Sequence, residues 1–270
     1  MSYHDSNGEE DAGAAGCLGI APAPAQLPKL SGPLAWVGSD FGSSCVYTWL
    51  LDEKDIGDIT SALDNFNALG IDGDCVSTET FPLEGLARKL QDITLSVHNG
   101  IGFAILKGLG KLHCSVEESV IVYLGLASYV AEHRGVQDKR GNVLTLTDSQ
   151  RHALDRVSAV AQETELRLRL ETGSLLFLNN WALLHRRDAY HDDDRTTRHM
   201  VRLWLRNTQL GWAVPEQFLP PWRAAYDRIS SPFKTRLYAL YPMATYIVPK
   251  YSAGSAAFVI EDSDESDPGQ

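Results

Sequence analysis

Residues 173–207 read GSLLFLNNWALLHRRDAYHDDDRTTRHMVRLWLRN, and this stretch contains the residues that most clearly indicate the fold and the function of the chain. Residues 174–179 form an apolar run that follows a glycine and ends in two asparagines, which is typical of a buried strand that ends in a turn. Residues 198–205 alternate between apolar and other side chains, which indicates a second strand, because the side chains of a strand alternate between its two faces. The stretch therefore predicts two strands joined by a polar segment.

Two arginines lie on the same face of the second predicted strand. Arg198 and Arg202 are four residues apart and share that face with Trp204. A buried guanidinium needs a partner, and its planar group suits a carboxylate or sulfonate bound through two hydrogen bonds. The alternative is that both arginines lie on a solvated face or pair with the acidic run at 192–194. That alternative is the simpler one from these residues alone, and a lone His185 is more often a hydrogen-bonded structural residue than a ligand.

The order and spacing of these residues resemble the C-terminal half of the catalytic core in the taurine dioxygenase-like (TauD/TfdA) family of Fe(II)/2-oxoglutarate oxygenases. That family has a Gly-Asp strand that ends in Asn-Asn, a distal metal-binding histidine, an acidic loop, and Arg-His-x-x-Arg leading into an Arg-Leu-Trp-Leu strand. The corresponding residues here are Gly173-Ser174, Asn179-Asn180, His185 and the run 198–205. Ser174 departs from the usual aspartate.

The resemblance implies a fold of the α+β class, with a double-stranded β-helix (jelly-roll) core and flanking helices. It also implies Fe(II) and 2-oxoglutarate as cofactors, and oxidation of a small anionic organic substrate. Carried over by position, His185 would be the distal iron ligand. Arg198 would bind the far carboxylate of 2-oxoglutarate, and Arg202 would face the substrate or the same carboxylate.

The family's His-x-Asp or His-x-Glu segment, which supplies the other two iron ligands, has no counterpart near residue 148. Here the chain passes almost directly into a helix predicted at 149–163, so an internal deletion is expected and the β-helix would be incomplete. Non-haem iron oxygenases bind Fe(II) through two histidines and a carboxylate. A rearranged site of His185, His191 and Asp193 is one alternative, and a solvated loop without ligands is the other.

The missing segment also leaves open whether the chain is a catalyst. The alternative function is that of a shortened or degenerate family member, a pseudoenzyme that at most binds a small carboxylate. Because removing strands from a sheet exposes unpaired edges, pairing with a second copy as a homo-oligomer would cover them.

The remaining predicted elements form the scaffold. Apolar residues at three- and four-residue steps predict helices at 51–69 and 86–95. A capping box of Ser115 and Glu118 begins a third helix, which is expected to stop near Gly135. A strand is predicted at 102–108, and three alternating leucines at 166–170 are expected to start the C-terminal strands.

The length and the charge of the chain indicate how many domains it has and whether it binds nucleic acid. The 270 residues are 44% hydrophobic and suffice for one domain with a core, predicted at 31–251. The net charge is -11, and nine of the acidic residues lie in the terminal segments 1–12 and 261–270. The body therefore gives no reason to expect nucleic-acid binding. Tails at 1–30 and 252–270 are predicted to be disordered.

The sequence carries no signal for export or for a membrane. Its four cysteines are scattered without a C-x-x-C pair, which argues against a zinc ribbon or a redox dithiol. The N-terminus has no apolar leader region, and no apolar run is long enough to cross a bilayer. We therefore expect a cytoplasmic protein with a small-molecule substrate and neither a nucleic-acid nor a membrane partner.

Overall fold

A computed structural model describes residues 30–135, 147–186 and 200–226. The chain divides into two units, residues 1–31 and 32–270, and nearly all of the first unit lies outside the described residues. The predicted tails at 1–30 and 252–270 also lie outside them, apart from Leu30. All the helices and strands described belong to the second unit.

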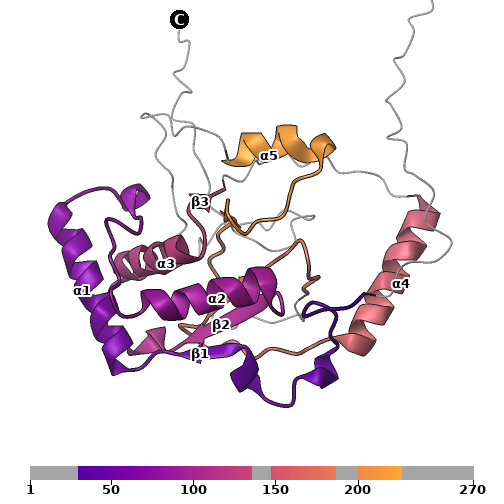
Figure 1. Cartoon of the computed structure of the whole chain (residues 1–270), viewed down its shortest axis with the longest axis horizontal. Coiled ribbons are helices and arrows are strands. Elements are labelled where there is room, and N and C mark those ends of the chain that lie inside the picture. Colours follow the sequence, from indigo (N-terminus) through magenta and orange to yellow (C-terminus); the bar gives the residue numbers. More distant parts are fainter. Residues whose placement is uncertain (1–29, 136–146, 187–199, 227–270) are drawn as a thin grey trace, which may run out of the picture. The chain divides into compact units, whose positions relative to one another are not determined.

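The described residues form five α-helices and five strands, with short 3-10 turns between them (Figure 1). The helices are α1 (Glu53–Leu69), α2 (Ala87–Asn99), α3 (Val116–Val130), α4 (Asp148–Thr164) and α5 (Leu219–Tyr226). The strands are β1 (Thr48–Leu50), β2 (Phe103–Lys107), β3 (His133–Arg134), β4 (Leu175–Leu178) and β5 (Leu205–Arg206).

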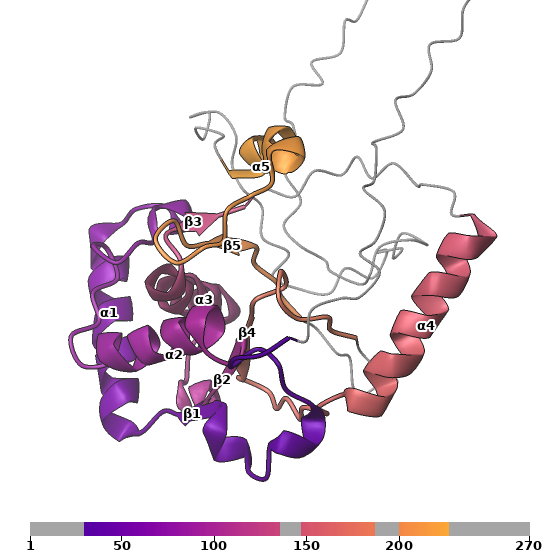
Figure 2. The same ribbon diagram turned by 45° about the vertical axis from the view of Figure 1, so that its right-hand side comes forward.

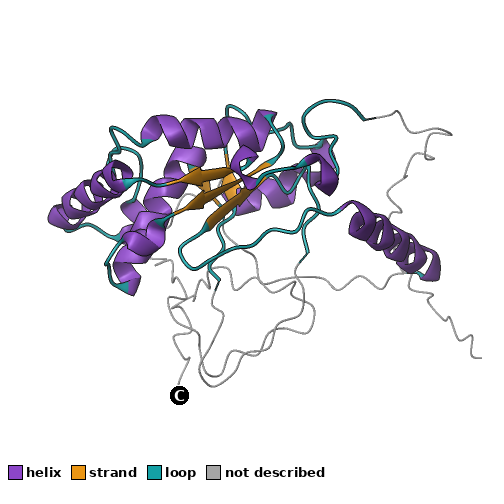
Figure 3. Cartoon of the chain, turned by 90° about the horizontal axis from the view of Figure 1, so that it is seen from below, coloured by secondary structure: helices purple, strands orange, loops and turns teal. Residues whose placement is uncertain are grey.

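The strands form two small sheets (Figure 3). The first has the order β1-β2-β4, with β1 parallel and β4 antiparallel to β2, so that Thr48 lies opposite Ile105 and Ala104 opposite Phe177. The second sheet pairs β3 with β5 in antiparallel fashion. The mixture of helices and small sheets agrees with the α+β class, but the described residues do not show the predicted double-stranded β-helix.

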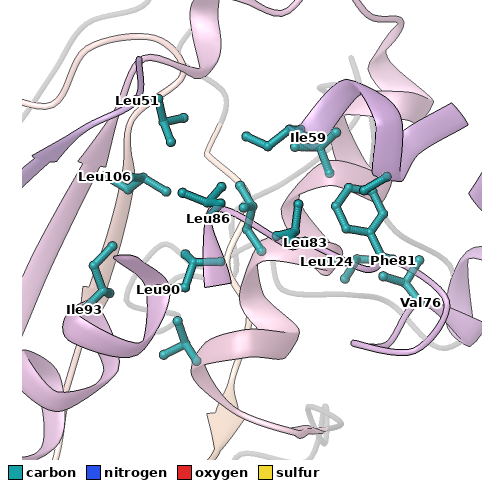
Figure 4. Packing of buried hydrophobic residues seen from close by; sticks show 14 of the residues in the cluster. Leu51, Ile59, Val76, Phe81, Leu83, Leu86, Leu90, Ile93, Leu106 and Leu124 are labelled. Carbon is teal, nitrogen blue, oxygen red and sulfur yellow. The ribbon is translucent and has the colours of Figure 1, made fainter. Parts of the chain in front are cut away.

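The core lies between the first sheet and helices α1, α2 and α3 (Figures 1 and 2). Ala104 and Leu106 of β2 face these helices, and Figure 4 shows Leu106 close to side chains such as Leu86 and Leu90. Helix α3 approaches the core closely because it has a glycine at position 125. A Cβ atom there would lie 2.5 Å from the nearest atom of the Phe81 ring.

The opposite face of β2 has its own apolar cover. Phe103 and Ile105 pack with Tyr47, and the rings of Trp36 and Phe41 lie against Phe103 at centroid distances of 5.7 and 6.0 Å. Strand β2 is therefore buried on both faces, and it supports β4, the strand that leads into the candidate site.

The predicted helices are confirmed with small shifts of their ends. α1 has the predicted glycine at its C-terminus, Gly70, in the left-handed conformation with φ of 60°. α2 continues to Asn99 instead of Leu95, and α3 ends at Val130 instead of near Gly135. α3 stops early because the following residues become extended and pair with β5.

Two strand predictions are wrong in part. Leu166, Leu168 and Leu170 do not form a strand, although all three pack against the cluster of Tyr47, Phe103 and Ile105. In the predicted strand at 198–205, the described residues 200–204 are not in a ladder, and pairing begins only at Leu205. A strand needs a neighbour along its whole length, and β3 supplies only two residues.

Candidate functional site

The turn after β4 positions His185. The backbone N–H of Asn179 donates to the carbonyl oxygen of Gly102 at 2.8 Å, which fixes the turn to the start of β2. The carbonyl oxygen of Asn179 accepts from the N–H groups of Ala182 and Leu183, at 3.1 and 3.0 Å, and its side-chain oxygen accepts from the N–H of Trp181 at 3.1 Å. Asn179 is buried, so the turn that leads to His185 is internally hydrogen-bonded and attached to the first sheet.

An ion-pair cluster fixes the residue after His185. Nε and Nη2 of Arg186 donate to Oε2 of Glu165 at 3.0 and 2.7 Å, and Arg167 Nε donates to the other carboxylate oxygen at 2.7 Å. Hydrogen bonds from Arg186 and then Arg167 hold the pKa of the Glu165 carboxyl below its ordinary value. The segment after His185 is thereby connected to the C-terminal end of α4.

Arg202 lies on a segment that is attached to α3 and β3. Leu203 and Leu205 pack against the helical core and are partly buried, as is Arg202, whereas Trp204 is exposed. The carbonyl oxygen of Trp204 accepts from the N–H of Gly135 at 2.7 Å, which extends the pairing of β3 with β5 by one hydrogen bond. Burial therefore alternates only at residues 203–205 of the predicted strand, and residues 200–204 do not form a ladder.

The positive charge of Arg202 acts electrostatically on His185. Burial lowers the pKa of His185, and repulsion from the Arg202 guanidinium lowers it further. The same guanidinium lies near the Tyr123 hydroxyl of α3, and it opposes the rise of the Tyr123 pKa to about 12 that burial causes. Interaction with the backbone of Leu203 also opposes that rise. Of the predicted site residues that the structure describes, Arg202 thus lies within electrostatic range of His185.

The other predicted site residues fall outside the described part of the chain. Arg198, His191 and Asp193 all lie in the gap at 187–199, so their roles stay predictions. Tyr123 was not predicted, although its hydroxyl in the apolar run VIVYLGL could have drawn attention to it.

An aromatic cluster lies beside these segments and was also missed. The ring of Trp222 on α5 is 5.5 Å from that of Trp181 and 4.7 Å from that of Tyr226, measured between centroids. The guanidinium carbon of Arg206 lies 5.7 Å from the Trp222 centroid. Nothing in the local sequence pattern links Trp181 to α5, because their contact depends on the tertiary fold.

The described residues contain neither a cluster of metal-ligand side chains nor a membrane-spanning helix. No group of three or more His, Cys, Asp or Glu side chains in ranges 30–135, 147–186 and 200–226 is placed to hold a metal ion. Within those same ranges, no helix is both long and apolar enough to cross a membrane.

Comparison with known proteins places similarity in the same region. Residues 145–204 match the family described as "Taurine catabolism dioxygenase TauD, TfdA family". A relative from Stachybotrys chartarum, the taurine hydroxylase-like protein SAT17, is 32% identical over 176 residues. That similarity covers 65% of this chain and 41% of the relative, so the matched part spans about two fifths of the relative's length.

Proposed function

Because the chain belongs to the taurine catabolism dioxygenase TauD, TfdA family, we propose that it has a dioxygenase-type function and binds 2-oxoglutarate through Arg198 and Arg202. The observation that supports this proposal is that the positive charge of Arg202 acts on His185 and helps to lower its pKa, in addition to burial. A guanidinium binds a carboxylate through two parallel hydrogen bonds, and partial burial strengthens such a pair. The role of Arg198 rests on the family resemblance.

The arrangement of charges supports an anionic ligand at this site. Arg202 is partly buried, whereas the neighbouring Arg186 is paired with Glu165 and so contributes less net positive charge. A small organic acid would pair its carboxylate with the Arg202 guanidinium and would lie near His185. We extend the same reasoning to the substrate, for which a small anionic organic molecule is the expected class.

Fe(II) is the metal that the family resemblance implies, and His185 would be one ligand. Non-haem iron oxygenases add a second histidine and a carboxylate. The described residues provide no group of three such side chains, so they do not fit Fe(II) by themselves. A complete site needs two further ligands from outside the described ranges, for which the sequence offers His191 and Asp193. We therefore assign no reaction step to the metal.

The incomplete ligand set favours a second candidate function. In that case the chain is a non-catalytic member of the family that binds a small carboxylate through Arg202 and its neighbours. This function needs only the arginine side chains and the packed segment 202–206. It does not require the His-x-Asp or His-x-Glu segment, whose absence near residue 148 is inferred from the sequence.

An anaerobic spectroscopic titration separates the two functions. Fe(II) and 2-oxoglutarate are added to the folded chain, and the visible charge-transfer band of an iron-bound 2-oxo acid is monitored. A band that disappears in His185→Ala supports the oxygenase function. No band, together with 2-oxoglutarate binding that is strongly weakened in Arg202→Gln, supports the non-catalytic function. Sequencing transcripts across the codons of Asp148 and Ser149 adds an independent test, because a longer message with a His-x-Asp or His-x-Glu segment favours the oxygenase.

A further inference from the structure

The side chain of Trp222 lies between the two segments that carry the candidate site. On one side its ring contacts the ring of Trp181, at 5.5 Å between centroids and an interplanar angle of 67°. On the other side the guanidinium carbon of Arg206 lies 5.7 Å from its centroid. Trp181 precedes His185 by four residues, and Arg206 follows Arg202 by four. The indole therefore connects the turn before His185 to the strand after Arg202.

Tyr226 fixes α5 in the position that this bridge requires. Its hydroxyl donates to the carbonyl oxygen of Leu205 at 3.5 Å, and its ring centroid lies 6.0 Å from the Arg206 guanidinium carbon. A Cβ atom at Gly135 would approach the Tyr226 ring to 3.0 Å, so this ring is seated closely against the end of β3. Figure 2 shows α5 beside β5 and β3. With Tyr226 seated there, Trp222 faces Trp181.

We propose that Trp222 is a positioning residue, which holds the turn bearing His185 and the segment bearing Arg202 at a fixed separation. Edge-to-face aromatic contact acts on the turn side, and the attraction of a cation for an aromatic face acts on the strand side. The buried Nε1 of Trp222 has no hydrogen-bond partner among the described residues. The contacts of Trp222 are therefore made by its aromatic ring. We expect Trp222→Phe, which keeps an aromatic ring, to position the two segments better than Trp222→Leu does. The identity of the ligand rests on the proposed function. The positioning role of Trp222 does not depend on that ligand.

The direct test uses NMR spectra of the ligand-free chain. Trp222→Leu is expected to shift the ring signals of His185 and the side-chain N–H signal of Arg202, and Trp222→Phe to shift them less. Trp36→Leu is the matched control. Its ring makes comparable contacts, at 5.0 Å to Phe41, and its Nε1 donates to the carbonyl oxygen of Ile101 at 2.9 Å. The control should destabilise the chain and leave the Arg202 side-chain signal in place. Unchanged His185 and Arg202 signals in a folded Trp222→Leu chain would overturn the proposal.

A binding cycle tests whether Trp222 acts through Arg202. Trp222→Leu is expected to weaken binding of 2-oxoglutarate by about three- to ten-fold, and to have no further effect in the Arg202→Gln background. An equal loss in both backgrounds would show that Trp222 does not act through Arg202 and would contradict the proposal. If the wild-type chain binds no 2-oxoglutarate, the proposed function fails, and the NMR comparison still decides the positioning role.

A second variant keeps the test decisive if Trp222→Leu does not fold. Arg206→Met removes the cation–aromatic contact with Trp222 and leaves the contact between Trp181 and Trp222 in place. The His185 ring signals are then expected to move, because Trp222 loses its contact with β5 and keeps only the attachment of α5 through Tyr226. A folded Arg206→Met chain with unchanged His185 signals would overturn the proposal.

Discussion

The side-chain amide of Asn207 donates a hydrogen bond to the main-chain oxygen of Val130, 3.0 Å away and 77 residues earlier in the chain. The side-chain oxygen of the same residue accepts from the N–H groups of Gln209 and Leu210, at 3.0 and 2.8 Å. Next to it, Glu132 accepts from the N–H of Thr208 at 2.7 Å. The segment that carries Arg202 is therefore attached to the end of α3 by side chains as well as by the pairing of β3 with β5.

Asn207→Ala is expected to lower the free energy of unfolding by about 1–3 kcal/mol, because it leaves the Val130 oxygen and two N–H groups without their partner. Urea unfolding of the two chains measures the difference. Asn99→Ala is the control, since the exposed side chain of Asn99 makes no hydrogen bond within the described residues. Equal stability of the Asn207→Ala chain and the wild type would show that this attachment contributes nothing.

Arg202→Gln is expected to raise the pKa of His185 in the metal-free chain, because it removes a repelling positive charge. Since the His185 pKa is lowered on folding, the unfolded chain takes up the proton more readily, and stability is lost as the pH falls through the folded pKa. The substitution should weaken this acid-side loss. NMR titration of the histidine ring signals measures the pKa directly.

Arg88→Gln serves as the control for that titration, because Arg88 is exposed on α2 and its charge does not contribute to the His185 pKa. A His185 pKa that is the same in Arg202→Gln and in the wild type would contradict the placement of Arg202 beside His185.

Tyr123→Phe is expected to change the stability of the chain at alkaline pH. Burial raises the pKa of Tyr123 to about 12, so its contribution is fully present below the unfolded value of about 10 and is lost as the pH rises toward 12. The expected loss is on the order of 2 kcal/mol, which Tyr123→Phe should abolish. Urea unfolding at a series of pH values from 9 upward checks this, and the same alkaline loss in both chains would refute it.

Leu154→Ala on α4 is expected to change the free energy of unfolding by less than about 0.5 kcal/mol, because this side chain is 52% exposed. Leu90→Ala on α2 removes a side chain with 0% exposure and should cost about 2–5 kcal/mol. Thermal unfolding of the two variants compares them. A loss for Leu154→Ala as large as that for Leu90→Ala would mean that the apolar face of α4 is covered in solution.

Elements that are set by local signals were predictable from the sequence. α1 has apolar residues at helical spacing and ends at a glycine, and α3 begins with the Ser115 and Glu118 capping box that the structure shows. The strand β2 was predicted to within one residue at each end. In the candidate site, the strand before His185 was predictable because its apolar run lies within one short stretch, and the roles of His185 and Arg202 stay predictions.

Features that depend on contacts between distant residues were not predictable. The alternating leucines at 166–170 have the pattern of a strand, yet they pack on Phe103 without pairing. The last residues of the 198–205 stretch find only the short strand β3 as a partner. The contact of Trp222 with Trp181 joins residues 41 positions apart through the tertiary fold. Periodicity reports which face of an element is apolar, and it does not report what covers that face.

The most direct test of the proposed function is a calorimetric titration of the folded chain with 2-oxoglutarate, carried out without oxygen. We expect saturable binding that Arg202→Gln weakens strongly and that Arg88→Gln leaves unchanged, because in the proposed function the guanidinium of Arg202 binds a carboxylate of the ligand. Absence of binding to the folded wild-type chain, or equal binding to the Arg202→Gln chain, would contradict the account.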